Sequence, residues 1–290
     1  MKKKYYITTF GCQMNEHDSE IISGILEHMD YDRVDEPQHA DVILVNTCCI
    51  REKAESKVLS FLGEMKAYAK KNPRLIVGVC GCMAQQKNIL PIINKAAPHV
   101  NLVFGTHNIL YLQYYIDEIL RTGHPVYRIF EEEESVAGIV DSARKYPFKA
   151  LVNIVFGCNN FCTYCIVPYV RGRERSRSYQ DIIEEITILA NDGVVEVTLL
   201  GQNVNSYGKD LANGCNFAEL LRKIEQIEGI ELIRYLTSHP KDLSDDLIDV
   251  VANSSKISKH FHLPIQSGSN SVLARMNRKY TREHYLDIIK

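Results

Sequence analysis

Three cysteines, Cys158, Cys162 and Cys165, lie within eight residues of one another. They follow an apolar run at residues 151–156, which predicts a buried strand. A strand that leads into a loop with three thiols suits an iron-sulfur cluster, because the irons of such clusters bind thiolates. The loop contains no fourth thiol, so one iron of the cluster would remain open to bind another molecule.

Two other uses of these thiols stay open at this point. A structural zinc ion would need a fourth protein ligand from elsewhere in the chain. A disulfide framework is typical of small secreted chains with paired cysteines, whereas this chain has nine cysteines, an odd number. The compact spacing favours a cluster over zinc binding and over unrelated thiols.

Length and composition describe the setting of the cysteine loop. A chain of 290 residues is long enough for two domains. Its composition, with 45% hydrophobic and 24% charged residues, is typical of a globular protein. No apolar run reaches the length of a membrane span, so we expect a cytoplasmic protein that contacts no membrane. Cysteines in that compartment stay reduced, which favours ligation over disulfides. The net charge of −2 means that a nucleic-acid partner would need a local basic patch.

The first part of the chain alternates strand-like and helix-like stretches. We expect strands at residues 5–10, 41–45, 75–79 and 101–105, and helices at 18–28, 51–71, after the third strand, and at 110–121. This alternation predicts an α/β domain with a doubly wound parallel sheet that is covered on both faces. The domain should span residues 1–130, followed by a connector at 131–147 that begins with four glutamates.

Residues 148–290 resume the alternation of strands and helices. Strands are expected at residues 151–156, 194–200, 232–236 and 260–264, with helices between them that begin near Ser178, Phe217 and Ser244. Four such units predict a partial (β/α) barrel. A last helix, capped by Thr281, runs to residue 290 without a terminating glycine or proline. We therefore expect the chain to be the N-terminal part of a longer protein.

Three of the expected strands in the first domain end in cysteine. Cys12 follows the first strand, Cys48 and Cys49 follow the second, and Cys80 and Cys82 lie at the end of the third. Ligands of open α/β sheets gather beyond the carboxyl ends of the strands. A single cysteine there would more often be a small buried apolar residue, but the repetition favours a second ligand site.

The whole chain resembles a known enzyme family. Cys158, Cys162 and Cys165 resemble the radical S-adenosylmethionine signature, and the upstream cysteines resemble those of the methylthiotransferases within that superfamily. Residues 9–16 and 46–53, with Gly81-Cys82, are most similar to the branch that acts on N6-dimethylallyladenosine in tRNA. The branch that acts on a ribosomal protein typically has Pro-Lys after its first cysteine, where this chain has Gln13-Met14.

The resemblance implies cofactors and ligands for them. Two 4Fe-4S clusters are expected, and the open iron of one binds S-adenosylmethionine to start radical chemistry. Cys158, Cys162 and Cys165 would hold that cluster, and Cys12, Cys48 and Cys82 would hold the other. Cys49, Cys80 and Cys215 receive no ligand role.

The resemblance also implies a reaction and partners. A methylthio group replaces the hydrogen at C2 of N6-dimethylallyladenosine 37, in the anticodon loop of tRNA. Radical chemistry is needed because that C–H bond has no acidic proton for a side chain to remove. An electron donor such as flavodoxin or ferredoxin is expected, and the chain would be a monomer. The open alternatives are another methylthiotransferase substrate, namely threonylcarbamoyl-adenosine tRNA or a ribosomal protein, or an inactive iron-sulfur or zinc-binding fragment.

A few other residues are candidates for binding. Gly201 and Gln202 follow the second barrel strand, and Gln266 and Ser267 follow the fourth, where cofactor contacts are expected, although each pair also suits a simple turn. Four arginines between Arg171 and Arg177 form a basic stretch that suits a phosphate, a cofactor carboxylate or a solvated surface. His239, His260 and His262 are expected to be structural, and no residue is assigned a catalytic role.

Overall fold

The computed structural model describes residues 2–49, 52–130, 142–212 and 214–290. The chain forms two compact units. The first consists of Met1–Ser135, Val140–Ala143 and Tyr169–Arg171, and the second of Val136–Ile139, Arg144–Pro168 and Gly172–Lys290. Most of the connector expected at residues 131–147 lies outside the described residues, so the predicted domain boundary stays a prediction.

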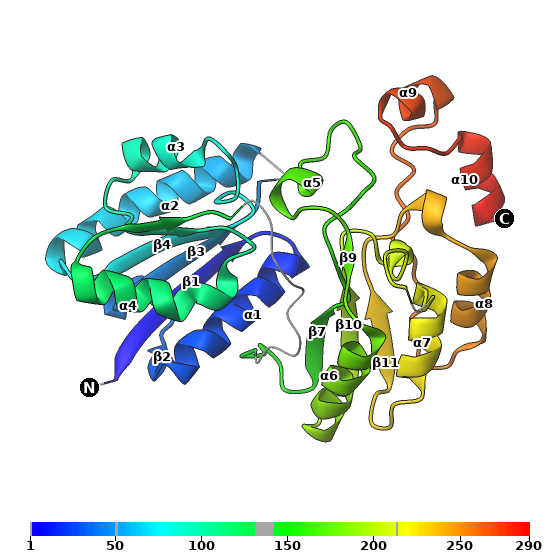
Figure 1. Ribbon diagram of the computed structural model, residues 1–290, viewed down its shortest axis with the longest axis horizontal. Helices are drawn as coiled ribbons and strands as arrows, with labels where there is room; N and C mark the ends of the chain where they lie inside the picture. Colours follow the sequence, from blue (N-terminus) through cyan, green and yellow to red (C-terminus); the bar gives the residue numbers. More distant parts are fainter. Residues whose placement is uncertain (1, 50–51, 131–141, 213) are drawn as a thin grey trace. The chain divides into compact units, whose positions relative to one another are not determined.

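The first unit is built on a six-stranded parallel sheet (Figure 1). Its strand order is β2-β1-β3-β4-β5-β6, so the chain winds outward in both directions from β1 and β3. The strands are β1 (Lys3–Phe10), β2 (Tyr31–Arg33), β3 (Val42–Thr47), β4 (Ile76–Gly81), β5 (Leu102–Phe104) and β6 (Val126–Arg128).

Helices cover both faces of this sheet. On β3, Val42 and Leu44 pack in the core beneath α1 (Gln13–His28) and α4 (Leu112–Thr122). The alternate residues, such as Ile43, face α2 (Glu52–Lys71) and α3 (Ile89–Ala96). This two-residue alternation between two cores confirms the predicted doubly wound α/β fold.

The predicted elements of the first unit differ from the structure at the edges. The strands β2 and β6 have only three residues each and include polar side chains, so they show no periodic pattern in the sequence. Helix α1 begins at Gln13 rather than at Asp18. Its first turn is mostly polar yet partly buried, as at Asn15 and His17. The spacing of apolar residues therefore did not predict this first part of the helix.

The second unit contains a three-stranded parallel sheet in the order β11-β10-β7. Its strands are β7 (Lys149–Asn153), β10 (Glu196–Leu200) and β11 (Leu232–Tyr235), and the helices α6 (Tyr179–Asn191), α7 (Phe217–Glu225) and α8 (Asp245–Asn253) pack on them. The side chains of Ser178 and Ser244 accept hydrogen bonds from the first turns of α6 and α8, which confirms the predicted helix starts.

The strand expected at residues 260–264 is wrong. After β11 the parallel pairing is limited to an isolated bridge between Ile233 and Ile257, with one further bond from the Ser238 N–H to the His262 carbonyl at 3.2 Å. Pro264 has no N–H to donate, so the ladder cannot extend through it. The barrel-like sheet therefore has three strands and an extended segment in place of the fourth.

The apolar run at residues 151–156 also divides in the structure. It forms β7 and then β8 (Val155–Phe156), which pairs antiparallel with β9 (Arg175–Ser176). Ile154 marks the change of partner, because its N–H bonds Leu200 of β10 while its carbonyl accepts from Arg177. The remaining helices are α5 (Val167–Val170), α9 (Asn270–Arg275) and α10 (Arg282–Ile289). Within the described ranges, no helix combines the length and apolar character that crossing a membrane requires.

Candidate metal centres and cofactor site

The three thiols predicted to hold the second cluster follow one row of paired residues in the first unit. Phe10 of β1 pairs with Thr47 of β3, and Thr47 pairs with Gly81 of β4. Cys12, Cys48 and Cys82 come just after these residues. The Cys48 N–H bonds the Phe10 carbonyl at 2.7 Å, which keeps this thiol at the carboxyl edge of the sheet. The three cysteine-bearing loops therefore begin at the same edge of the sheet, and their sharing of one cluster stays a prediction.

Gly81 is required at this edge by both conformation and space. Its φ of 87° is in the left-handed region. A Cβ on Gly81 would lie 2.3 Å from Asn46 Oδ1 and 2.6 Å from the Thr47 carbonyl oxygen. The turn that presents Cys82 thus packs directly against the end of β3.

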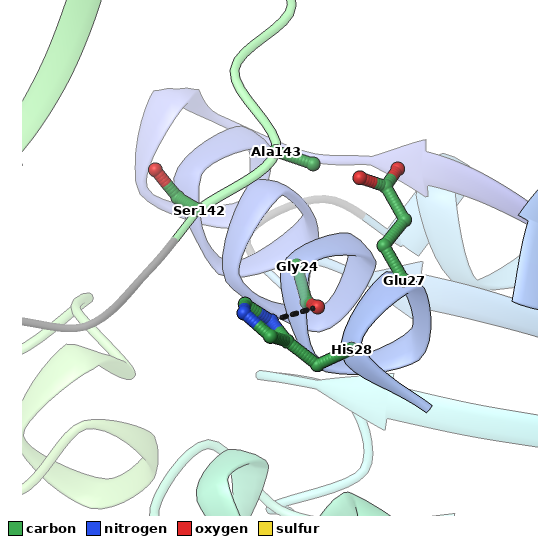
Figure 2. Close-up of a pocket in the computed structure, with 5 residues that line it drawn as sticks. All are labelled: Gly24, Glu27, His28, Ser142 and Ala143. Atoms are coloured by element: carbon green, nitrogen blue, oxygen red, sulfur yellow. Dashed lines mark hydrogen bonds between the residues drawn. The ribbon is translucent and has the colours of Figure 1, made fainter. Parts of the chain in front are cut away.

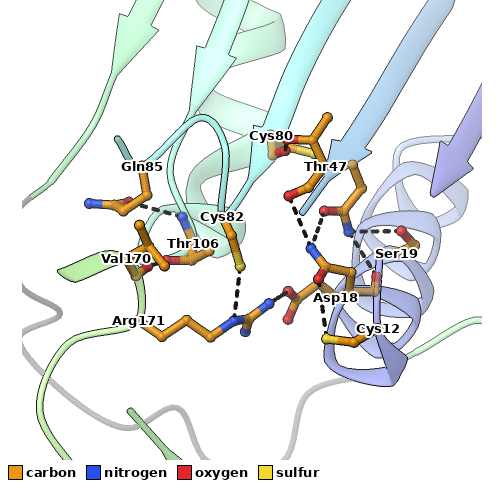
Figure 3. A network of polar contacts seen from close by, with 12 residues as sticks. Cys12, Asp18, Ser19, Thr47, Cys80, Cys82, Gln85, Thr106, Val170 and Arg171 are labelled. Carbon is orange, nitrogen blue, oxygen red and sulfur yellow. Dashed lines mark hydrogen bonds and ion pairs between the residues drawn. The ribbon is translucent and has the colours of Figure 1, made fainter. Parts of the chain in front are cut away.

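Buried amides hold the thiol-bearing loops together. Asn15 Nδ2 donates to Asn46 Oδ1 at 3.0 Å, and Asn46 Nδ2 donates to Ser19 Oγ at 2.9 Å. The Cys12 thiol in turn lies 3.4 Å from Asn15 Oδ1. This network, drawn in part in Figure 3, links the loop after β1 to the end of β3.

Two thiols of this edge, Cys49 and Cys82, have pKa values that shift in opposite directions. A hydrogen bond from Cys49 and the positive charge of Arg171 lower the pKa of Cys82, against the effect of burial. The same hydrogen bond and burial raise the pKa of Cys49. Cys49 therefore lies beside the three predicted ligands, although the sequence assigned it no role. Cys80 instead packs in the core, fully buried.

The cysteine loop of the second unit is also shaped by a glycine. Gly157 has a φ of 70°, and a Cβ there would lie 2.1 Å from the Arg173 carbonyl oxygen. The Cys158 N–H bonds the Gly172 carbonyl at 3.2 Å, and the Cys165 N–H bonds the Cys162 carbonyl at 2.9 Å. Burial raises the pKa of Cys158 and of Cys165.

A segment between α9 and α10 supports this loop. The Thr163 N–H bonds the Met276 carbonyl at 3.2 Å, and Asn277 Nδ2 donates to the Phe161 carbonyl at 3.0 Å. Arg278, which is 5% exposed, donates to the Cys162 sulfur at 3.4 Å. These supporting residues were missed in the sequence, because they are far from the cysteines and follow no spacing rule.

Metal binding by the cysteines stays a prediction. Among the residues that the structure describes, no three His, Cys, Asp or Glu side chains converge as one metal ion would require. A 4Fe-4S cluster takes one thiolate on each of three irons, so each cysteine triad has the number of thiols that a cluster with one open iron requires. No disulfide joins the nine cysteines, all of which lie in the described ranges.

Buried polar atoms without a partner line the carboxyl edge of the second sheet. Gln202, predicted to contact a cofactor, has both amide atoms buried and without a hydrogen bond within the described structure. The same holds for one or more polar atoms in each of these residues: Asn153, Thr198, Asn203, Asn205, Ser238 and His239. They come from β7, β10 and the segments after β10 and β11. Since buried polar groups are normally paired, these atoms are available to bond water or a polar ligand.

His239 is held as a neutral donor in this set. Its Nδ1 accepts a hydrogen bond from the Lys241 N–H at 3.2 Å, so a neutral ring carries its proton on Nε2. Burial, together with the charge of Arg278, lowers the pKa of His239 to about 4. The imidazole therefore offers an N–H to a ligand near neutral pH. The sequence predicted only a structural role for it.

The other predicted contacts differ in their surroundings. A Cβ on Gly201 would lie 2.4 Å from Val155 Cγ1, so this glycine allows close packing of the loop after β10. Gln266 is exposed, and Ser267 Oγ accepts a bond from the Ser269 N–H at 3.1 Å, within a turn. Their contact with a cofactor stays a prediction.

Two cavities lie away from the thiols. One of about 300 Å³ is lined by Gly24, Glu27, His28, Ser142 and Ala143 of the first unit (Figure 2). The other, of about 330 Å³, is in the second unit and includes Asn205, Lys241 and Asp242 in its lining. The second cavity therefore shares Asn205 with the set of buried polar atoms.

Two family models match separate parts of the chain. Residues 4–105 match the family described as "Uncharacterized protein family UPF0004", and residues 152–290 match the Radical SAM superfamily. The chain is 54% identical over 288 residues to tRNA-2-methylthio-N(6)-dimethylallyladenosine synthase from Alkaliphilus oremlandii, a match that covers 99% of this chain and 61% of that protein. The protein of the same name from Clostridium perfringens is 50% identical over 289 residues, covering 100% of this chain and 65% of that protein. The chain thus spans less than two thirds of these relatives.

A solved structure shares the fold. The radical S-adenosylmethionine methyltransferase TsrM from Kitasatospora setae, bound to tryptophan and an S-adenosylmethionine analogue, matches with a TM-score of 0.63. The match covers 99% of this chain and 65% of that chain, at 11% sequence identity. At that identity the likeness concerns the fold alone.

Proposed function

Because the chain belongs to the radical S-adenosylmethionine methylthiotransferase family, we propose that it performs the chemistry of a tRNA methylthiotransferase. The proposed reaction places a methylthio group on C2 of N6-dimethylallyladenosine 37. The observation that carries the proposal is the pair of cysteine triads, one presented by each unit and each supported by buried polar side chains.

Cys158, Cys162 and Cys165 would hold the first 4Fe-4S cluster. With S-adenosylmethionine bound, that cluster supplies the radical chemistry that opens a C–H bond without an acidic proton. The protein itself orients the bound cofactors and shields them from solvent. Cys158 and Cys162 are buried, and Arg278 donates to the Cys162 sulfur at 3.4 Å, which partly neutralises a ligating thiolate.

S-Adenosylmethionine would satisfy the buried polar atoms beyond the second sheet. Its amino, carboxylate and ribose groups require both donors and acceptors. The Gln202 amide offers both, the Ser238 hydroxyl offers either, and the neutral His239 offers an N–H from Nε2. Gly201, Gln266 and Ser267 are the further proposed contacts.

Cys12, Cys48 and Cys82 would hold the second 4Fe-4S cluster. Their position beyond β1, β3 and β4 is at the carboxyl edge of the sheet, where open α/β sheets bind their ligands. A ligating cysteine must lose its proton, and the hydrogen bond from Cys49 and the charge of Arg171 lower the pKa of Cys82.

The substrate and partners belong to the same proposal. The proposed substrate is the anticodon loop of tRNA, where an unpaired base can be splayed out and read at its edges. A flavodoxin or ferredoxin would supply electrons to a monomeric protein in the cytoplasm.

Two measurements test this function. After anaerobic reconstitution, the chain should form 5′-deoxyadenosine from S-adenosylmethionine and dithionite, whereas the Cys158→Ala variant should not. Mass spectrometry should then detect the methylthio group on tRNA that carries N6-dimethylallyladenosine. A chain that binds zinc in place of iron, or an iron-loaded chain that leaves this tRNA unmodified, would contradict the proposal.

A further inference from the structure

Arg171 is a buried arginine in the basic stretch that the sequence singled out. It is 6% exposed and belongs to the first unit, as do Asp18 and Cys82. Its Nη2 donates to Asp18 Oδ2 at 2.6 Å, and its Nε donates to the Cys82 sulfur at 3.3 Å. Figure 3 shows the guanidinium reaching both groups. Of the three uses left open for the basic stretch, a solvated surface does not apply to this arginine.

The backbone next to Arg171 is fixed as firmly as its side chain. Thr106 Oγ1 donates to the Val170 carbonyl at 2.7 Å, and the Thr106 N–H donates to Gln85 Oε1 at 3.1 Å. Gln85 Nε2 donates in turn to the Phe130 carbonyl at 2.6 Å. Since both ends of the arginine are held, the direction of its Nε–H toward the sulfur is set by the fold and not by the thiol.

Asp18 determines what this contact can do. A buried guanidinium needs a counter-charge, and the 5% exposed Asp18 side chain supplies it. The Asp18 carboxylate offsets part of the guanidinium charge, so Arg171 acts on Cys82 through the remaining positive charge and through a directed N–H donor. An arginine serves this purpose because its planar fork binds a carboxylate and a second acceptor at once, which a lysine ammonium does less well.

We propose that Arg171, oriented by Asp18, is a positioning residue that donates a hydrogen bond to the Cys82 thiolate of the second cluster and raises the reduction potential of that cluster. The inference rests on the proposed function, because it requires Cys82 to be an iron ligand. Hydrogen bonds to ligating sulfurs withdraw electron density and stabilise the reduced cluster. The role is specific to this arginine. Arg173 is exposed over the Phe161 ring, and Arg177 pairs with Glu185 at 2.6 Å.

The test isolates the second cluster. A chain with Cys158, Cys162 and Cys165 all changed to alanine is reconstituted anaerobically and titrated with dithionite, and electron paramagnetic resonance follows the reduced cluster. In this background Arg171→Lys keeps a positive charge beside Asp18 but loses the planar guanidinium that donates to Asp18 and Cys82 at once. The double variant Arg171→Gln/Asp18→Asn removes both charges together, so no unpaired charge stays buried. Arg173→Gln is the matched control.

The ratio of reduced to oxidised cluster at a fixed potential should fall about tenfold in Arg171→Lys and in the double variant, a shift of roughly 59 mV for one electron. Arg173→Gln should leave the ratio unchanged. An unchanged ratio in both Arg171 variants with full iron loading would overturn the inference and leave the proposed function intact. Loss of iron in folded Arg171 variants would also overturn it, because a tuning residue is not needed for binding. Absence of iron from the parent background would instead contradict the proposed function.

Discussion

Arg278 Nη1 lies 3.4 Å from the Cys162 sulfur, while its Nη2 donates to the Pro264 carbonyl at 3.4 Å. One buried side chain therefore joins the cysteine loop to the extended segment that follows β11. Both segments belong to the second unit. Since residues 260–264 lack the ladder of a strand, side-chain bonds of this kind hold the segment in place.

Replacing Arg278 by glutamine should weaken the second unit. The loss of hydrogen bonds from a charged donor is expected to lower the free energy of unfolding by about 2 kcal/mol. Iron held by Cys158, Cys162 and Cys165 should also be lost faster on gel filtration. Urea unfolding and iron analysis measure the two effects. The exposed Arg275, changed to glutamine, is the control and should alter neither; an effect of equal size there would contradict the assigned contact.

Replacing Gly81 by alanine should disrupt the edge that carries the second triad. The added Cβ would approach Asn46 Oδ1 to 2.3 Å at a φ of 87°, so we expect a loss of roughly 3 kcal/mol in unfolding free energy. Gly123→Ala is the control that measures the cost of the positive φ without a steric clash. Gly123 has a φ of 71°, and no atom lies within 4 Å of its added Cβ. That variant should lose only about 1 kcal/mol. Equal losses would show that the close contact is unimportant.

Cys48 and Cys49 should differ in iron binding although they are neighbours. Changing Cys48 to alanine should remove about four irons, whereas Cys49→Ala should keep them, by the ligand count of a four-iron cluster. Iron and sulfide analysis after reconstitution makes the comparison. Because Cys49 hydrogen-bonds Cys82, equal losses would make Cys49 a candidate ligand and refute the predicted distinction.

The sequence predicted the parts of this protein that follow local rules. Apolar spacing located the main strands and helices, and the cap residues Ser178 and Ser244 marked helix starts. Strand ends placed Cys12, Cys48 and Cys82 together, because parallel strands meet at one edge. It could not predict Arg171 and Asp18, or Arg278 and Cys162, since these pairs are far apart in the sequence and depend on tertiary packing.

His239 should make the stability of the chain depend on pH. Burial lowers its pKa to about 4 in the folded state, from an ordinary value of about 6.5. The charges of Arg278, Lys241 and Lys209 act in the same direction, and Asp242 opposes them. The contribution of neutral His239 to the free energy of unfolding is complete above the ordinary pKa and is lost as pH falls toward 4. Between these two pKa values only the unfolded chain takes up the proton.

A His239→Gln variant isolates this effect. Between about pH 7 and about pH 4.5, the wild-type chain should lose roughly 2 kcal/mol more unfolding free energy than the variant, as the linkage between pKa and stability requires. Urea titrations at the two pH values measure the difference. Parallel pH dependence of the two proteins would mean that His239 titrates normally in the fold.

The most direct test of the two-triad account is iron counting with each triad removed in turn. The reconstituted chain should hold about eight irons, and about four after Cys12, Cys48 and Cys82 are changed to alanine, by the expected pair of four-iron clusters. Alanines at Cys158, Cys162 and Cys165 should likewise leave about four, with Mössbauer spectra typical of one 4Fe-4S cluster in each variant. If either triple variant kept all the iron of the parent chain, or if removing one triad abolished both clusters in a folded chain, the account would be contradicted.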